Sequence, residues 1–232
     1  MTVCAPLKLG QRETISPAEL GRTLCTEVAE QVPYWVAVLT PAERPLLGRH
    51  AALPEWNSTT LALPHGPRRV LLLAALGSAV CTWQRNSHRG SSAGVLVDLD
   101  LYGTGAVHPI RLPAVGTDAL AMSSHPQRLV DEVARRLDSV PNAGRDYALA
   151  RNYPMLAARG GAQILVRDGA PREPSGEHTI EIDLVATDAG TAAARVSWAG
   201  GLQGVDELLR LWSTAIHHLA ATPADVRGSS AA

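Results

Sequence analysis

Apolar residues recur along this chain at the spacings that helices and buried strands require. Residues 68–84 are apolar on nearly every side, which predicts a helix buried in the core. Residues 124–138 are amphipathic, with one apolar face that consists of Leu129, Val130, Val133 and Leu137. A last helix is expected over 205–219, with an inner face that consists of Val205, Leu208, Leu209, Trp212 and Leu219. We expect Leu72, Trp83, Val133, Leu137 and Trp212 to be core residues.

Shorter apolar segments predict strands. They are 95–101, 108–113, 162–167, 179–186 and 192–198. The last two are expected to form an antiparallel pair joined through Asp188-Ala189-Gly190, and a turn-rich connection is expected over 169–177. Residues 48–67 contain many turn-forming residues and predict a loop with at most one short strand. Helices mixed with strands predict an α/β (α+β) fold.

Two segments have the form of helix starts. Ser16-Pro17-Ala18-Glu19 resembles a capping box with proline at the first helical position, and Thr40-Pro41-Ala42-Glu43 is a second signal of this kind. The apolar stretch Pro33-Tyr34-Trp35-Val36 between them is expected to pack on the core. We expect one domain over 1–222 and a disordered tail over 223–232.

Composition excludes few functions, but it gives no support for some kinds of partner. The formal net charge is −1, which gives no reason to expect binding to nucleic acid or to a membrane surface. The longest apolar run, Val70–Trp83, is shorter than the roughly 20 residues that a membrane span needs. We expect a cytoplasmic protein without a secretion signal. Cys4, Cys25 and Cys81 lack metal-ligand spacing and are expected to be small buried residues or free thiols.

Several residue pairs invite a chemical interpretation. His217-His218 lies within the last predicted helix and is expected to be a surface pair rather than an acyl-transfer motif. Asp98 and Asp100 are two residues apart on one strand, so their side chains face the same way. Such a pair can perform acid–base chemistry, although strand-end aspartates more often bind loop amides or water. Motifs for a nucleophile elbow, a phosphate loop or a zinc helix are absent, and we expect no metal and no directly bound cofactor.

Six segments, in order over roughly residues 60–220, resemble the carboxy-terminal half of condensation and epimerization domains of non-ribosomal peptide synthetases. They are the apolar helix 71–83, the strand 95–100, the strand 108–112, Val140-Pro141-Asn142-Ala143-Gly144 with Tyr147–Arg151, the strand 163–166, and His178-Thr179-Ile180-Glu181-Ile182. The fourth is similar to the family's "VPNKG…YGLLRY" and the last to its "HPLEI". These two favour the epimerization branch.

The departures from the family are equally informative. The sequence lacks the half that carries the family's His-His-x-x-x-Asp-Gly motif and the segment "SRTVGWFT". In the alignment, Asp100 replaces the epimerization glutamate and Tyr102 replaces the neighbouring histidine. Asp100 and Tyr102 are therefore weak catalytic candidates, and we expect no catalysis from the chain alone.

The resemblance implies a chloramphenicol-acetyltransferase-like lobe, with a mixed sheet flanked by helices. It also implies a substrate held on the phosphopantetheine arm of a carrier protein. Three hypotheses remain open: a degenerate structural or docking module that binds peptidyl carrier protein or synthetase fragments, a lobe that completes an active site with a partner lobe, and a free-standing binding protein. A homodimer that imitates the missing lobe is a further possibility.

Overall fold

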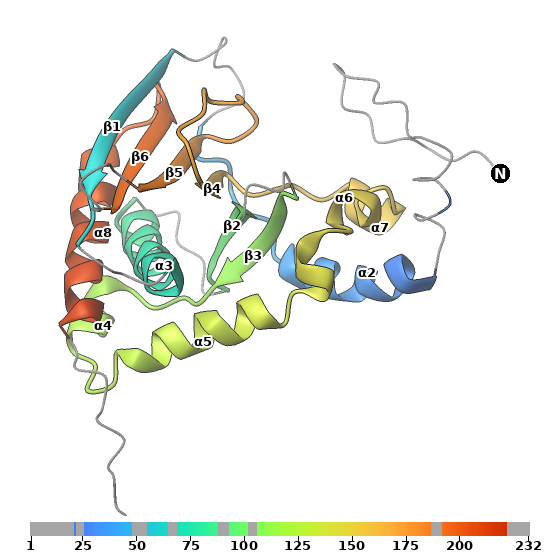
Figure 1. The fold of residues 1–232 in the computed structure, drawn as a ribbon, viewed down its shortest axis with the longest axis horizontal. Helices are drawn as coiled ribbons and strands as arrows, with labels where there is room; N and C mark the ends of the chain where they lie inside the picture. The colour runs from blue at the N-terminus through green and yellow to red at the C-terminus, as the bar shows by residue number, and fades with distance from the viewer. Residues whose placement is uncertain are drawn as a thin grey trace, which may run out of the picture.

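The computed structural model describes residues 21, 26–47, 55–64, 69–87, 93–101, 106–186 and 192–221. Six strands form one mixed sheet in the order β1-β6-β5-β4-β2-β3 (Figure 1). The strands are β1 (Trp56–Ala62), β2 (Val95–Asp100), β3 (His108–Leu112), β4 (Ile164–Asp168), β5 (Ile180–Ala186) and β6 (Ala192–Ala199). The predicted α/β class and the predicted strands are confirmed, including the single strand within 48–67 and the antiparallel pair β5–β6.

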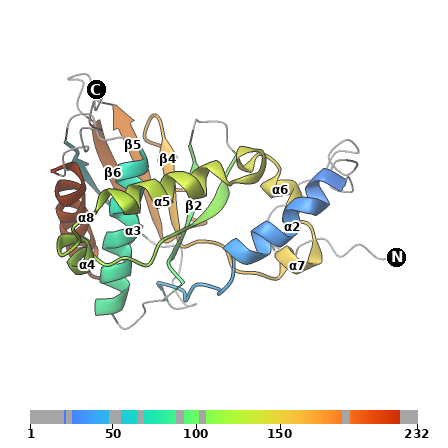
Figure 2. The ribbon, with the colours of Figure 1, turned by 90° about the horizontal axis from the view of Figure 1, so that it is seen from below.

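Helices pack against both faces of this sheet. The helices are α2 (Thr26–Val38), α3 (Arg69–Asn86), α4 (Thr117–Ala121), α5 (Gln127–Asp138), α6 (Tyr147–Ala150), α7 (Pro154–Ala157) and α8 (Val205–Ala220), with a 3₁₀ turn over Pro141–Gly144. Figure 2 shows α3, α5 and α8 on the same side of the sheet. The strand residues that face them are apolar, among them Val97, Val166, Ile182 and Val196. This side of the sheet is the hydrophobic core.

The helix α3 is apolar nearly all round because it has neighbours on several sides. It packs against α8, α5, α4 and the strands β2 and β3, so it has little surface for polar side chains. Gly77 allows the close approach to β3, since a Cβ atom there would lie 2.9 Å from the Cβ of Leu112. The prediction of a deeply buried helix at this position is confirmed.

A second apolar cluster lies on the other side of β2. Its centre is Trp35, fully buried on α2, in contact with the ring of Tyr147 on α6 at 4.8 Å between ring centroids. Leu96 of β2 and Leu156 of α7 belong to the same cluster. The expectation that residues 33–36 pack on the core is confirmed for Trp35, although this cluster is separate from the one beneath the helices.

The Val140–Gly144 segment, part of the family resemblance, forms a left-handed turn. Asn142, Ala143 and Gly144 have φ values of 44°, 49° and 78°. A Cβ atom at residue 144 would lie 2.1 Å from Nδ1 of His108, so only glycine fits there. The carboxylate of Asp146 accepts a bond of 2.7 Å from the Asn142 amide and thereby supports the turn. This arrangement fixes the path of the chain from α5 into α6.

The helix-start prediction at Thr40-Pro41-Ala42-Glu43 is wrong, because the described residues that follow it, 41–47, are not helical. The polar atoms in and near this segment accept hydrogen bonds from residues that are distant in the sequence. The carboxylate of Glu43 accepts a 2.5 Å hydrogen bond from the backbone N–H of Leu96, and the guanidinium of Arg111 donates to the carbonyls of Val38 and Pro41 at 2.8 Å each. Tertiary contacts therefore override the local signal.

Other predictions had mixed outcomes. Leu72, Trp83, Val133 and Trp212 are buried core residues, whereas Leu137 is only partly buried against the core. On α8, Leu209 is also only partly buried, and Leu211 and Ile216 contribute to the inner face. The signal at 16–19 and the tail at 223–232 lie outside the described residues. Among the helices of the described residues, none is long and apolar enough to cross a membrane.

Candidate functional site

The face of the sheet opposite α3, α5 and α8 carries charged residues in register. Strand pairing aligns Asp100 of β2 with Arg167 of β4, then with Asp183 of β5 and Arg195 of β6. The signs of these four charges alternate across the sheet. A second row, two residues away along each strand, holds Asp98, Glu181 and Ser197 together with Leu165. Side chains that are neighbours in register lie on the same face, so these two rows form one polar surface.

Most of this polar surface is buried. The side chain of Glu181 has 0% exposure, those of Asp183 and Asp100 have 2% each, and that of Arg167 has 7%. Arg167 compensates two of the carboxylates: Nε donates to Oδ1 of Asp183 at 2.7 Å, and Nη2 forms an ion pair with Oε2 of Glu181 at 3.0 Å. Burying these charges without such partners would cost several kcal/mol for each ion.

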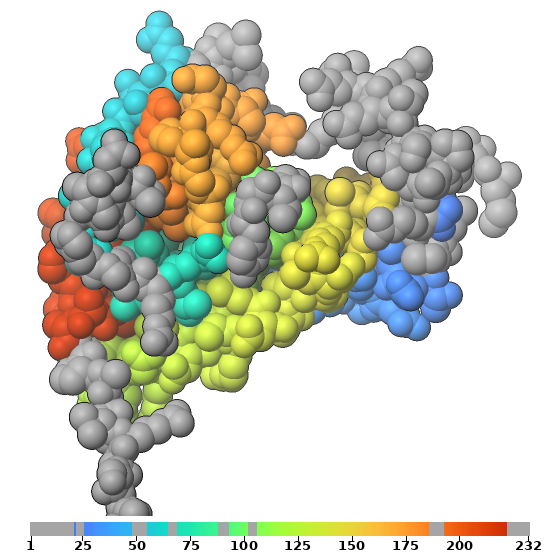
Figure 3. All heavy atoms as spheres, viewed as in Figure 1, coloured from blue at the N-terminus to red at the C-terminus, as the bar shows by residue number. Residues whose placement is uncertain are grey.

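The β4–β5 connection, residues 169–179, covers this surface. The strands β4 and β5 are parallel neighbours, so their connection must run back along the sheet from the end of one strand to the start of the next. It crosses the polar face and donates to it: Ser175 gives its N–H and its hydroxyl to Glu181 at 2.8 and 2.6 Å, and the N–H of Arg172 bonds Asp183 at 3.3 Å. Figure 3 shows this connection, in orange, on the surface of the molecule.

Asp100, the predicted site residue, lies beneath this connection. Its Oδ2 accepts a 3.2 Å hydrogen bond from Nη1 of Arg172, whose side chain is 49% exposed. The carboxylate is thus held in an ion pair with a residue from the covering segment. Tyr102, the second predicted site residue, lies outside the described residues.

Asp98 has a partner that sequence reasoning missed. Nε2 of His178 lies 2.8 Å from Oδ2 of Asp98, with exposed fractions of 8% for the histidine and 14% for the aspartate side chain. A carboxylate can only accept, so Nε2 carries the proton and Nδ1 is the acceptor in the neutral ring. Nδ1 is buried and has no hydrogen-bond partner among the described residues. The carboxylate thus orients the ring, as it does in histidine bases, while the second ring nitrogen is enclosed by the protein.

Two further titratable groups lie close enough to be influenced by Asp98. Burial is the main cause that raises the pKa of Glu43, and its bond from Leu96 and the charge of Arg111 partly offset this, while Asp98 adds to the increase. Burial also raises the pKa of Tyr147 to about 12, with Arg151 opposing the shift and Asp98 supporting it. Oε2 of Glu43 is buried and has no hydrogen-bond partner among the described residues. Asp98 therefore lies at the boundary between the polar surface and the second apolar cluster.

Other sequence candidates lie elsewhere. His217 and His218 are exposed in the last turn of α8, as expected for a surface pair. Cys81 is a free, partly buried thiol, and Cys4 and Cys25 lie outside the described residues. Within the described ranges, no group of three or more His, Cys, Asp or Glu side chains is arranged to hold a metal ion.

The site thus consists of two polar pairs side by side on β2, Asp98 with His178 and Asp100 with Arg172. The sequence placed both aspartates on one face of a strand. It did not indicate their partners, which lie 80 and 72 residues away in the chain. The one available signal was the position of His178 at the start of a predicted strand.

Comparison with solved structures defines the class of this α/β lobe. The chain matches an epimerization domain from the third module of tyrocidine synthetase B, with a TM-score of 0.63 and 17% identity over 88% of this chain and 57% of that one. It also matches a cyclization-docking bidomain of a non-ribosomal peptide synthetase from Sorangium cellulosum, with a TM-score of 0.58 and 11% identity over 89% and 51% of the two chains. No family model and no curated protein matches the sequence.

The fold is therefore that of one lobe of a condensation/epimerization domain, and the chain spans about half the length of the structures it matches. A wax ester synthase/diacylglycerol acyltransferase from Marinobacter aquaeolei VT8 shares the fold as well, with a TM-score of 0.52 and 11% identity over 89% of this chain and 57% of that one. Because proteins named for different reactions share this fold, the fold alone does not define the chemistry.

Proposed function

We propose that the chain is a non-catalytic carboxy-terminal lobe that serves as a structural or docking module in non-ribosomal peptide biosynthesis. The state of Asp100 is the observation that carries this proposal. An acid–base catalyst must reach the proton that it transfers. Asp100 has 2% side-chain exposure, is paired with Arg172 and lies beneath the β4–β5 connection, so it is held for structure rather than for proton transfer.

The partners that this function needs are a carrier protein or synthetase fragments. The fold is one lobe of a two-lobed domain. By the family resemblance, such a lobe works with a carrier protein that has a phosphopantetheine arm, and it packs against an amino-terminal lobe. The purified chain, immobilised on a resin, should therefore retain a carrier protein or a synthetase fragment that includes an amino-terminal lobe. Failure to retain either would overturn the docking function.

Catalysis is tested separately with an aminoacyl thioester on a carrier protein in D₂O. With the purified chain alone, incorporation of deuterium at the α-carbon should equal the rate without protein. Incorporation clearly above that rate would show that the lobe is catalytic. An Asp100→Asn variant is the matched control, because it keeps the shape of the side chain and removes the charge.

The Asp98–His178 pair favours a second candidate function, in which this lobe completes an active site with a partner lobe that supplies the His-His-x-x-x-Asp-Gly motif. The carboxylate of Asp98 orients the imidazole of His178, as carboxylates orient histidine bases. Catalysis under this alternative requires that the buried Nδ1 becomes accessible when the partner lobe binds. Under this alternative, the mixture of the two lobes exchanges deuterium, and His178→Gln lowers the rate on the order of 100-fold or more, the range for a general base. If the mixture exchanges deuterium and His178→Gln leaves the rate unchanged, the histidine has only a structural role.

A further inference from the structure

The two edges of the sheet differ in how well they are protected against pairing with another strand. At one edge, all five residues of β3 are buried, Pro109 interrupts the row of donors, and Arg136 of α5 donates to the carbonyl of Arg111 at 2.5 Å. At the other edge, β1 has seven residues, and Asn57 to Thr60 are exposed. None of the described strands pairs with the outer side of β1. It contains neither proline nor a charged residue, the two features that commonly protect an edge strand.

Pairing with β6 determines which backbone groups of β1 point outward. The carbonyl of Glu55 accepts from the N–H of Gly200 at 2.6 Å, so this residue directs its backbone groups toward β6. Antiparallel ladders alternate, and the register of β1 with β6 continues without a bulge from Trp56 to Ala62. The even-numbered residues of β1, from 56 to 62, therefore present their N–H and carbonyl groups to the outside.

We infer that β1 pairs with β1 of a second copy of this chain, antiparallel and about a two-fold axis at Thr59. This register makes use of every outward-facing residue, because it places Trp56 opposite Ala62 and Ser58 opposite Thr60 of the partner copy. It forms about eight N–H···O bonds and extends the sheet through both copies. Registers centred on residue 58 or 60 would leave outward groups at the strand ends unpaired.

The side chains on β1 are compatible with this self-pairing. Thr59 meets its own copy, Asn57 meets Leu61, and Ser58 meets Thr60, so no like charges face each other. Pairs of threonine and serine across antiparallel strands are favourable. A charged edge would repel its own copy, which is the usual way in which proteins prevent such pairing.

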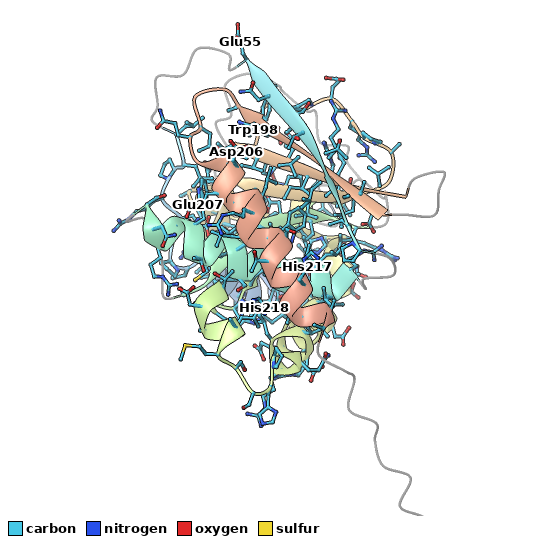
Figure 4. The ribbon with its side chains drawn as sticks, turned by 90° about the vertical axis from the view of Figure 1, so that its left-hand side faces the viewer. Glu55, Trp198, Asp206, Glu207, His217 and His218 are labelled. Atoms are coloured by element: carbon cyan, nitrogen blue, oxygen red, sulfur yellow. The ribbon has the colours of Figure 1, made fainter. Side chains whose placement is uncertain are left out.

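The direction of α8 is compatible with the same two-fold arrangement. The end of β6 lies beside the start of β1, and α8 begins six residues after β6 ends, so α8 starts near the start of β1. Figure 4 shows Glu55, Asp206 and Glu207 toward one end of this side of the molecule and His217 and His218 toward the other. The two-fold axis reverses the direction of α8 in the second copy. The acidic start of each helix then faces the opposite end of its copy, so no two acidic ends meet, which makes the edge compatible with a second copy of the chain.

Cysteine cross-linking tests this register directly. The experiment uses the full chain with Cys4, Cys25 and Cys81 changed to alanine. Thr59→Cys alone should form a disulfide-linked dimer under mild oxidation, because a non-hydrogen-bonded antiparallel pair places the two Cα atoms about 4.5 Å apart. Ser58→Cys alone and Thr60→Cys alone are matched controls. Each lies roughly 8 Å from its own copy, beyond the range for a disulfide, and should cross-link at least tenfold more slowly.

A mixture of Ser58→Cys and Thr60→Cys chains should cross-link, since these residues face each other. Equal cross-linking of all three single variants would indicate random collision and would overturn the inference. Sedimentation provides the independent measurement: the unmodified chain should have about twice the mass of the 24.5 kDa monomer. Ser58→Pro should yield the monomer and leave the circular dichroism unchanged, because it removes an outward N–H and no bond to β6.

A monomeric unmodified chain at high micromolar concentration would overturn the inference, as would a dimer that Ser58→Pro leaves intact. The test is independent of the proposed function, because it measures mass and cross-linking and requires no carrier protein or second lobe.

Discussion

The two faces of the sheet are buried by different means. Under α3, α5 and α8 the strands present aliphatic side chains such as Val97, Val166 and Ile182, which are each at most 1% exposed. Their burial is favourable in itself, at roughly 25 cal/mol for each Å² of apolar surface. On the opposite face, Arg167, Glu181 and Asp183 are nearly as deeply buried, although burial of a charge is unfavourable unless a partner compensates it.

This difference separates stability from specificity. The apolar face is sufficient to hold the helices against the sheet, and it has no need of the charges on the other side. A well-packed apolar residue would serve as well or better at most of the charged positions. The charges do fix the path of the β4–β5 connection, because its Arg172 and Ser175 bind the carboxylates at defined atoms. We therefore regard the polar face as the part of the lobe that fixes the position of this connection.

The largest effect is expected on the polar face. Arg167→Met leaves the buried carboxylates of Glu181 and Asp183 without their cation, and it should lower the free energy of unfolding by about 3–5 kcal/mol. Urea-induced unfolding measures this loss. The matched control adds Glu181→Leu and Asp183→Leu to Arg167→Met and should restore much of the stability. A single variant within about 1 kcal/mol of the unmodified chain would show that these charges are not desolvated.

On the apolar face, the loss of stability on truncating a side chain should increase with the burial of that side chain. Leu76→Ala on α3 removes a side chain that is 1% exposed and should cost about 2–5 kcal/mol. Leu137→Ala on α5 should cost less, about 1 kcal/mol, because Leu137 is only partly buried against the core. Thermal unfolding of the two variants distinguishes them. Equal losses would mean that the last turn of α5 packs more deeply than described.

The smallest effect at neutral pH is expected in the second apolar cluster. Tyr147→Phe should change stability by on the order of 1 kcal/mol or less at pH 7. At alkaline pH the unmodified chain should lose stability relative to Tyr147→Phe. Burial raises the pKa of Tyr147 from 10.0 to about 12, so the native state holds a proton that the unfolded state releases. The resulting stabilisation is present below pH 10 and is lost as the pH rises from 10 to 12.

Phenolate absorbance checks this directly, because the chain has four tyrosines and the Tyr147→Phe variant removes the contribution of one of them. The difference between the titrations of the unmodified chain and Tyr147→Phe should be centred near pH 12. A difference centred near pH 10 would show that Tyr147 is exposed to solvent.

The spacing of apolar residues was sufficient to predict much of this fold. It placed α3, α5 and α8, the strands and four of the five expected core residues, because hydrophobic burial follows the repeat of each element and requires no knowledge of its neighbours. The short helices α4, α6 and α7 were not predicted, since each has only four or five residues and depends on tertiary contacts. The false helix start at Thr40 has the same origin: Leu96 takes the carboxylate that a capping box would have used.

The sequence by itself determined that Asp98 and Asp100 share one face of a strand, and it determined which face of each helix is apolar. Only the tertiary structure decided that His178 binds Asp98, that Arg172 binds Asp100, and that the β4–β5 connection covers both pairs. The physical reason is the range of the interactions. Periodicity acts between residues a few positions apart, whereas each of these polar contacts joins residues 72 or 80 positions apart through the register of three strands.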